Sequence, residues 1–379
     1  MIKPVEDDTI AAAAMRDAAV TYEEIGDAEA HIAAPADPAL HRELPENTRA
    51  FFRADGPLSR LDSARKYEYR PQQEAMAEAA AMALAENHNL CVEAPTGVGK
   101  SFAYLVPAIH FAVKESRPVV ISTETINLQE QLLDKDIPLL RQVIGVEFKA
   151  ALAKGRSNYV CLRRLYMAVG ERQAEFFPDG PALAEAKRIT RWLEGHPGDG
   201  SKADIPFNCD GGVWANICCE GGNCRGPKCS FFRQCYYWKA RRSWDQADII
   251  ISNHALFFAD HKMKIAGEVE NTLLPPYAAL IVDEAHTLED NAAEHLGLRI
   301  TQTGFHYFLR RLFNSKGGGG LLLRAGKETL ELRETVAELE GLSQTFFAMV
   351  EQLLIDRNES GKLPKKQCKL TGGRGFESL

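Results

Sequence analysis

Short runs of β-branched and apolar residues alternate with segments of helical periodicity between residues 66 and 290. Five runs predict buried strands: NLCVEA (89–94), RPVVIST (117–123), EFKAALA (147–153), ADIIISN (247–253) and AALIVDEA (278–285). Amphipathic helices are predicted between the first three of these, at 100–115 and 127–143. Because strands that alternate with helices favour a parallel sheet covered on both faces, we expect an α/β fold.

Three regions depart from this alternation. Residues 1–65 are rich in alanine and acidic residues, and they predict a poorly packed helical N-terminal extension. Residues 154–244 hold most of the cysteines, and residues 291–379 include a long amphipathic helix at 327–354. We interpret the last two regions as insertions on a sheet domain made of residues 66–153 and 245–290.

The N-terminus is acidic and lacks the apolar core of a signal peptide, and no apolar run approaches the roughly 18–20 residues that span a bilayer. We therefore expect a cytoplasmic protein with no membrane partner. In a reducing compartment, nine cysteines favour metal or redox chemistry over disulfides. The net charge of −7 does not indicate nucleic-acid binding, yet residues 225–242 carry six Lys or Arg and no acid. This basic stretch fits a nucleic-acid contact and a solvated helix face about equally.

The segment EAPTGVGKS (93–101) follows a predicted strand and opens a predicted helix. Its glycines let backbone N–H groups face a phosphate at the positive end of the helix dipole, as in a P-loop. Lys100 would reach the β- and γ-phosphates, and Ser101 would bind Mg²⁺. Ala94 stands where the usual pattern has its first glycine, which relaxes the match. The predicted nucleotide-binding residues of this loop are Thr96, Gly97, Val98, Gly99, Lys100 and Ser101.

The segment LIVDEAH (280–286) ends an apolar strand with two carboxylates. At the carboxyl edge of a parallel sheet, these acids would lie beside the phosphate loop. Asp283 would then hold Mg²⁺ through water, and Glu284 would orient or deprotonate the attacking water. His286 would couple the nucleotide site to the moving parts. The alternative is an exposed helix start capped by its own acids.

A P-loop together with DEAH resembles the superfamily 2 helicases. In that resemblance, YEYRPQQ (67–73) is similar to the adenine-reading segment, with Arg70 and Gln73 as its working residues. STETINLQEQL (122–132) and SNHALF (252–257) are similar to segments near the nucleic-acid path. The resemblance implies DNA contacts by Thr123, Gln129, Asn253 and His254.

Cys224, Cys229 and Cys235 lie within twelve residues, and GRSNYVC supplies Cys161 as a fourth thiol. Four thiolates suit Zn²⁺ or an iron–sulfur cluster, and the wide gaps argue mildly against zinc. This arrangement between the P-loop and DEAH resembles the DinG branch of the XPD-like helicases. The resemblance implies a RecA-like sheet, a [4Fe–4S] cluster on the four cysteines, a partial helical arch at 291–379, and 5′ to 3′ unwinding of DNA. The CC pair, Cys218 and Cys219, could compete for a ligand position. We rank it, and Cys209, below the four cysteines chosen because the spacing of these three fits no cluster pattern, and their roles stay open.

The basic stretch is also aromatic. Tyr236, Tyr237 and Trp238 precede Lys239, Arg241 and Arg242, and this combination suits single-stranded DNA, whose bases stack on rings while cations bind phosphates. Lys154 and Arg156 would line the same passage. The equal alternative is that the rings pack beneath the cluster and only the charges face outward.

The sequence contains neither the Q-x-x-G-R-x-x-R segment nor the S-A-T motif of a second motor domain. We therefore expect the second motor domain to be absent or on a separate chain, and ATP hydrolysis by these 379 residues to be weak. The predicted function is that of an ATP-dependent DNA helicase with ATP, Mg²⁺ and [4Fe–4S], acting on single-stranded or forked DNA. A role in DNA repair is what the resemblance implies. The alternatives are a non-catalytic, cluster-bearing DNA-binding remnant and a zinc-containing P-loop ATPase that does not act on DNA.

Overall fold

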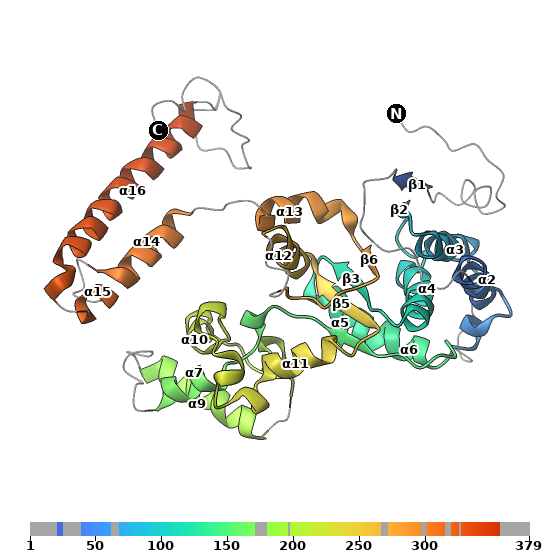
Figure 1. Cartoon of the computed structure of the whole chain (residues 1–379), viewed down its shortest axis with the longest axis horizontal. Coiled ribbons are helices and arrows are strands. Elements are labelled where there is room, and N and C mark those ends of the chain that lie inside the picture. Colours follow the sequence, from blue (N-terminus) through green and yellow to red (C-terminus); the bar gives the residue numbers. More distant parts are fainter. Residues whose placement is uncertain are drawn as a thin grey trace. The chain divides into compact units, whose positions relative to one another are not determined.

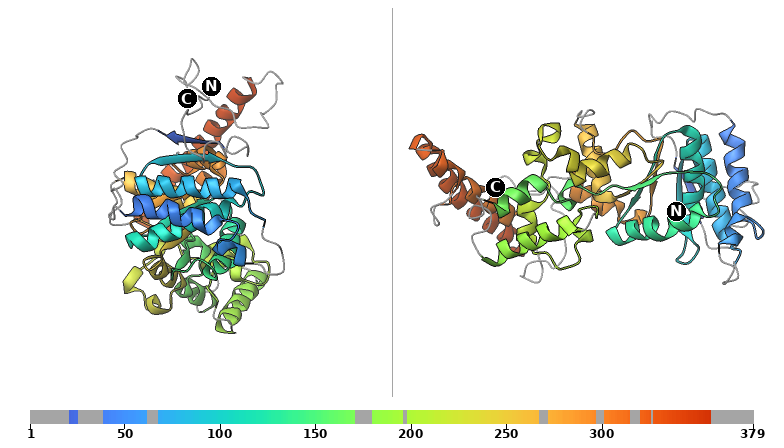
Figure 2. Two further views of the ribbon diagram at one scale, coloured as in Figure 1. Left: turned by 90° about the vertical axis from the view of Figure 1, so that its right-hand side faces the viewer. Right: turned by 90° about the horizontal axis from the view of Figure 1, so that it is seen from below.

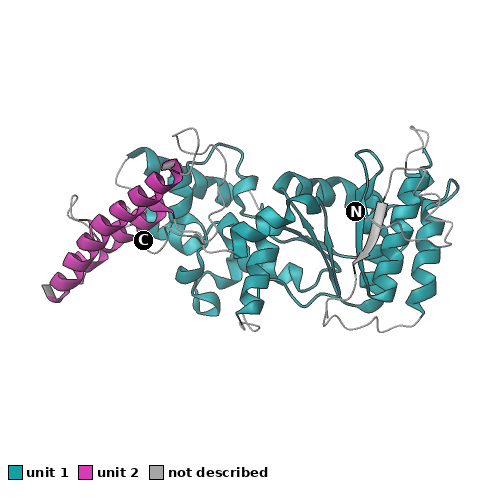
Figure 3. Cartoon of the chain, turned by 90° about the horizontal axis from the view of Figure 1, so that it is seen from above, with its two compact units in different colours: residues 1–296 teal, residues 297–379 magenta. Residues whose placement is uncertain are grey.

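The computed structural model describes residues 21–25, 39–61, 68–170, 180–195, 198–266, 272–296, 301–314, 320–325 and 327–356. The chain divides into two compact units, Met1–Leu296 and Gly297–Leu379 (Figure 3). The first unit carries every motif discussed above.

A four-stranded parallel sheet lies inside the first unit (Figure 1). Its strands, in order across the sheet, are β4 (Ala150–Leu152), β5 (Ile249–Asn253), β3 (Val119–Thr123) and β6 (Ala279–Val282). The register pairs Val119 with both Ile249 and Ala279, so the carboxyl ends of these strands meet at one edge. The prediction of an α/β fold with a parallel sheet is confirmed.

The strand before the P-loop differs from the prediction. β2 (Asn89–Glu93) is not hydrogen-bonded to the four-stranded sheet and pairs antiparallel with β1 (Thr21–Ile25). Its side chains alternate between exposed and half-buried, and Val92 packs against Ala75. NLCVE therefore behaves as a strand with one covered face, because its polar residues alternate with apolar ones. Our expectation that it is a fully buried member of the parallel set was wrong.

Helices α2 (Leu40–Phe52), α3 (Pro71–Glu86) and α4 (Lys100–Glu115) pack side by side (Figure 2). Leu40, Leu44, Phe51 and Phe52 of α2 are all buried in the main apolar core. Their spacing places them on one helical face. The expectation of a poorly packed extension is therefore wrong for residues 40–52, and most of residues 1–38 lie outside the described part of the chain.

The predicted helix at 127–143 is present in three pieces. α5 (Ile126–Gln131) continues through a π-helical turn, Leu132–Asp136, into α6 (Ile137–Arg141). α12 (His254–Ile265) follows β5, and α13 (Leu288–Leu296) follows the DEAH segment. None of the described helices is long and apolar enough to cross a membrane.

The cysteine-rich region has its own apolar core within the first unit. It contains α7 (Leu162–Val169), α9 (Gly180–Gly195), α10 (Gly211–Ile217) and α11 (Tyr236–Trp244). A second apolar cluster joins the region to the sheet, because Tyr159 and Trp244 pack with Val120 and Ile250. The Trp244 indole N–H also donates to the Leu152 carbonyl at 3.0 Å, which ties α11 to β4.

The second unit is helical. It contains α14 (Gln302–Leu312), α15 (Leu321–Arg324) and α16 (Leu330–Asp356), and α16 confirms the long helix predicted at 327–354. α14 packs on α16 through buried Leu309 and Val336, and His306 Nε2 lies 3.0 Å from Ser343 Oγ.

Candidate functional site

The phosphate loop connects β2 to α4 with an open backbone. Gly97 and Gly99 have φ values of 88° and 89°, in the left-handed region that favours glycine. Thr96 and Gly97 are exposed, while Val98 is buried beneath them. The Lys100 ammonium donates to the Ala94 carbonyl at 3.4 Å, so the lysine lies across its own loop. The loop is thus open to solvent at Thr96 and Gly97, beside a cation that an entering phosphate can take over.

The residues predicted to read adenine contact the loop directly. Gln73 is 6% exposed and its amide donates to the Gly99 carbonyl at 2.9 Å. A Cβ at Gly99 would collide with the Gln73 amide nitrogen, so the close approach requires glycine there. Arg70 is exposed and donates to the Gly97 carbonyl. Both side chains therefore lie at the loop and brace its two left-handed glycines.

The two predicted halves of the nucleotide site meet through a tyrosine. Tyr104, on the first turns of α4, donates its hydroxyl to Asp283 Oδ2 at 3.0 Å. Burial, followed by the negative charge of Asp283, raises the pKa of Tyr104 far above its ordinary value, so the phenol keeps its proton and remains a donor. Asp283 also receives the Glu284 backbone N–H at 3.0 Å. Sequence reasoning missed Tyr104, which looks like an ordinary apolar position of the helix.

A third carboxylate at this site was also missed. Asp136 ends the π-helical turn, and Oδ2 of its side chain is buried with no hydrogen-bond partner among the described residues. Burial raises the pKa of Asp136, the Ser101 hydroxyl lowers it by hydrogen bonding, and Asp283 raises it. Asp136 is therefore close to both predicted Mg²⁺ residues. The sequence did offer a signal for Asp136. It is four residues from the buried Leu132 and four from the buried Leu140, so an acidic residue lies on the apolar face of the helix.

Beyond Asp283 the chain makes a tight turn. Glu284 adopts a left-handed conformation with φ 55°, which is uncommon for a residue with a side chain. The carboxylate of Glu284 lies 3.5 Å from Nδ1 of His286, whose side chain is 74% exposed. Glu284 is therefore held at the sheet edge next to Asp283, and His286 faces solvent.

Ser122 connects Asp283, which follows β6, to His254, which follows β5. Its carbonyl accepts the Asp283 backbone N–H at 2.8 Å, and its hydroxyl lies 2.7 Å from His254 Nδ1. His254 is fully buried, and burial lowers its pKa, which favours the neutral ring. The His254 ring therefore lies inside the protein, against our expectation of a DNA contact.

The other side chains at this edge that were predicted to contact the DNA backbone are mainly buried or bonded within the protein. Thr123 is fully buried, Gln129 is 1% exposed, and Asn253 caps α12 by accepting the Leu256 N–H at 2.9 Å. These side chains shape the carboxyl edge of the sheet from within. The exposed residues at the edge are 124–127, at the beginning of α5.

The side chains of the basic and aromatic stretch also differ in how deeply they are buried. Tyr237 is 3% exposed, and Tyr236 and Trp238 pack against the same apolar cluster. Lys154 is 9% exposed and lies 3.5 Å from Asp199. This arrangement favours the alternative in which the rings pack inward.

The cations around these rings differ in exposure. The Arg156 guanidinium carbon is 4.9 Å from the centroid of the Tyr237 ring, and Arg241 is half-buried and donates to the Thr272 carbonyl. Lys239 and Arg242 are exposed on α11. Lys239 and Arg242 of α11 are therefore open to solvent, and Arg225, Lys228 and Arg233 earlier in the basic stretch are exposed as well.

Three of the four predicted cluster cysteines share one pocket. Cys161, Cys224 and Cys235 pack against the apolar cluster that contains Tyr159, Tyr237 and Trp244, and a fourth thiol, Cys219, is buried in it. Burial, then the neighbouring thiols of Cys224, Cys161 and Cys235, raise the pKa of Cys219 to about 12. Among the described residues, no group of three or more His, Cys, Asp or Glu is arranged to hold a metal ion.

Comparison with known families covers both halves of the nucleotide site. Residues 69–168 match the DEAD/DEAH box helicase family, and residues 227–305 match the family described as DEAD_2. The first match contains the loop with Lys100 and Ser101, and the second contains Asp283, Cys229 and Cys235.

The chain is also similar to curated proteins. It is 34% identical over 250 residues to the ATP-dependent DNA helicase YoaA of Haemophilus influenzae, covering 66% of this chain and 37% of that protein. It is 35% identical over 258 residues to the ATP-dependent helicase DinG of Mycobacterium tuberculosis, covering 64% of this chain and 38% of that protein. The chain thus spans less than two fifths of these relatives. By its motifs and these similarities, the chain resembles the DinG-type branch of the DEAD/DEAH box helicases over the matched part of its length.

Proposed function

We propose that this chain is the nucleotide-binding motor part of an ATP-dependent DNA helicase that moves 5′ to 3′ on single-stranded DNA. The observation that carries the proposal is the meeting of the phosphate loop and the DEAH acids through Tyr104 and Asp283. The name of the YoaA relative, an ATP-dependent DNA helicase, supports DNA as the substrate.

In the proposed mechanism, Lys100 leaves the Ala94 carbonyl and binds the β- and γ-phosphates of ATP. Ser101 and Asp283 would hold Mg²⁺, which when bound would supply positive charge to the phosphates. Glu284, held at the sheet edge, orients the attacking water and accepts its proton. Arg70 and Gln73 bind the adenine side of the nucleotide while they brace Gly97 and Gly99. His286, exposed beside Glu284, would transmit the nucleotide state to the moving parts of the motor.

We further propose that Cys161, Cys224, Cys229 and Cys235 hold a [4Fe–4S] cluster. The support is that three of the four lie in one apolar pocket between α11 and the bridge at residues 159–161. Such a group would crosslink the loops of residues 154–244 and guide the DNA strand. Because thiols must lose their protons to bind iron, loading of the buried pocket would release protons.

DNA would bind through exposed cations and the open sheet edge. Lys239 and Arg242 are exposed cations on α11, at the end of the basic stretch, and Arg156 and Arg241 lie over the rings of Tyr237 and Trp244. The exposed residues 124–127 lie at the carboxyl edge of the sheet. Contacts of these groups with the DNA backbone do not depend on the base sequence.

The test is binding of a fluorescent single-stranded oligonucleotide to anaerobically purified protein, measured by anisotropy over a range of salt concentrations. We expect Lys239→Ala/Arg242→Ala to weaken binding and to lower the salt slope by about 0.7 for each phosphate that the variant no longer neutralises. The matched control is Lys149→Ala, because Lys149 is exposed next to the amino end of β4. Equal salt slopes for both variants and the wild type would contradict the proposed DNA path.

A further inference from the structure

Residues 159–161 and 217–219 form a short antiparallel bridge that positions the CC pair. Val160 pairs with Cys218, Cys161 donates its N–H to the Ile217 carbonyl at 2.8 Å, and Cys219 donates to the Tyr159 carbonyl at 2.8 Å. Side chains alternate between the two faces of such a ladder. Val160 and Cys218 therefore share one face, and Cys161 and Cys219 share the other as diagonal neighbours, a relation that places such residues about 7–8 Å apart.

The packing agrees with this alternation. Cys218 belongs with Val160 to the core of α7, α9 and α10. Cys219 is 2% exposed and belongs instead to the pocket that Cys161, Cys224 and Cys235 line. The two adjacent cysteines thus have different surroundings, and only Cys219 joins the predicted ligands.

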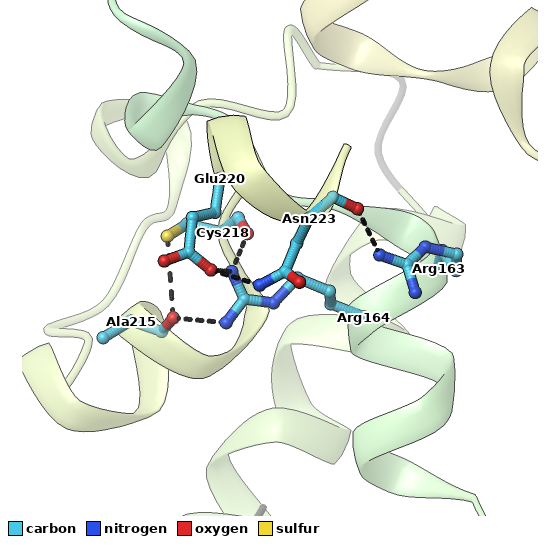
Figure 4. Close-up of polar contacts among 6 residues, drawn as sticks. All are labelled: Arg163, Arg164, Ala215, Cys218, Glu220 and Asn223. Atoms are coloured by element: carbon cyan, nitrogen blue, oxygen red, sulfur yellow. Dashed lines mark hydrogen bonds and ion pairs between the residues drawn. The ribbon is translucent and has the colours of Figure 1, made fainter. Parts of the chain in front are cut away.

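Two arginines of α7 hold the segment that carries Cys219 (Figure 4). Arg164 donates to the carbonyls of Cys218 and Ala215 at 2.9 Å each and pairs with Glu220 at 3.2 Å. Arg163 donates to the Asn223 carbonyl at 2.7 Å. Because α7 begins directly after Cys161, these bonds fix Cys161 and the segment from 215 to 223 relative to each other.

Cys229 is held differently. It lies between two single 3₁₀ turns, Gly226–Lys228 and Phe232–Gln234, and its N–H donates to the nearby Gly226 carbonyl at 3.0 Å. Within the described range 198–266, Cys229 is not part of the apolar cluster that contains the other three predicted ligands and Cys219. Its position therefore depends on local bonds of a short loop.

We propose that Cys219 is a fifth thiolate donor of this pocket. It completes the ligand set of an iron–sulfur cluster when Cys229 dissociates from the cluster or is replaced. The proposal rests on the proposed function for the identity of the bound group. In the exchange, the Cys219 sulfur forms the new bond to iron and loses its proton, while the departing Cys229 thiolate takes up one proton. The exchange changes no oxidation state and needs no further reactant.

The test is iron and acid-labile sulfide per chain, with the visible spectrum, on anaerobically purified protein. We expect Cys229→Ser to retain iron with a shifted spectrum. We expect Cys219→Ser/Cys229→Ser to lose iron to the level of Cys161→Ser. The matched control is Cys218→Ser/Cys229→Ser, which changes the neighbouring thiol on the opposite face and should retain as much iron as Cys229→Ser.

Loss of all iron from Cys229→Ser, or equal iron in Cys229→Ser and Cys219→Ser/Cys229→Ser, would overturn the role of Cys219. Wild-type protein without iron would instead refute the proposed cluster itself, and this role with it, so the two failures are distinguishable. Should the double variant not fold, the single Cys219→Ser provides a second measurement. It should lose iron to a chelator faster than wild type, and an unchanged rate would also overturn the proposal.

Discussion

The phosphate loop and the thiol pocket lie in the same unit but are lined in opposite ways. The loop is exposed at Thr96 and Gly97 and offers mainly backbone groups, whereas the pocket is lined by thiols and rings and Cys219 is 2% exposed. A ligand that is exchanged at every cycle needs an open site whose donors are preorganised by backbone conformation. A group that stays bound needs a closed site, and its binding is then coupled to folding. Changes in the pocket should therefore affect stability, and changes in the loop should affect affinity.

The largest effect on stability is expected from Trp244→Ala. Trp244 is 1% exposed, its ring meets the Tyr237 ring, and its indole binds the Leu152 carbonyl. Truncation of a buried aromatic residue costs about 3–5 kcal/mol in the free energy of unfolding. Urea denaturation followed by circular dichroism measures it, with Trp192→Ala on α9 as a control at a half-buried site. An equal loss in both variants would show that Trp244 has no special role in joining α11 to the sheet.

A substitution in the phosphate loop should instead lower the affinity for ATP and leave the stability unchanged. Lys100→Ala removes a charge-assisted interaction worth about 1.5–3 kcal/mol, which is roughly a 10- to 150-fold loss of ATP affinity. Its unfolding curve should match that of wild type. Calorimetric titration with a non-hydrolysable ATP analogue and Mg²⁺ measures the affinity. Lys114→Ala at the other end of α4, where Lys114 pairs with Glu43, is the control and should bind normally. Normal binding by Lys100→Ala would remove the phosphate loop from the proposed site.

A smaller effect is expected from Arg164→Ala. Only 12% of the Arg164 side chain is exposed, and it binds two carbonyls of the segment before Cys219. Loss of these bonds should cost about 1–1.5 kcal/mol in stability and lower iron retention. Arg163→Ala, whose bond to Asn223 is exposed, should change both quantities less. If the two variants behave alike, the segment is not held mainly by Arg164.

The smallest effect concerns pH. Because the folded-state pKa of Asp136 is raised, the folded protein holds this proton to a higher pH than the unfolded chain, whose ordinary pKa is 3.8. Stability contributed by Asp136 therefore falls as the pH rises from that value through the raised folded-state pKa. Asp136→Asn should remove this part of the fall, be more stable at neutral pH, and bind Mg²⁺ with ATP more weakly. Urea denaturation across the acid range tests it against Asp134→Asn, an exposed acid of the same turn. An unchanged pH slope would contradict it.

The sequence predicted the features of the molecule that depend on residues close together in the chain. All five strands lie at the predicted positions. Four of them form the parallel sheet, because runs such as IIIS and VVIS are apolar on both faces. The phosphate loop was identified because its glycines, lysine and serine are contiguous. The packing of helix 40–52 was missed, although Leu40, Leu44, Phe51 and Phe52 have helical spacing, because Pro45 and the acidic surroundings weakened the pattern.

The remaining site residues depend on contacts between distant segments. Tyr104 reaches Asp283 across 179 residues of sequence, and Ser122 meets His254 across 132. The division between Cys218 and Cys219 is set by one backbone bridge to residues 159–161, which has no sequence signature. Thr123, Gln129 and His254 were assigned to DNA by motif, yet their burial follows from positions at the ends of central strands and on an inward helix face.

The π-helical turn at Leu132–Asp136 makes the chain tolerant of the loss of one residue at this point. Such a turn contains one residue more than an α-helical turn. Deletion of one residue between 132 and 135 would restore an α-helical turn, and α5 and α6 would keep nearly the same angular positions about their common axis. The same deletion inside α4 would rotate the residues that follow it by about 100° relative to those before it. An in-frame deletion in α4 should therefore be far more damaging than one in the π-helical turn.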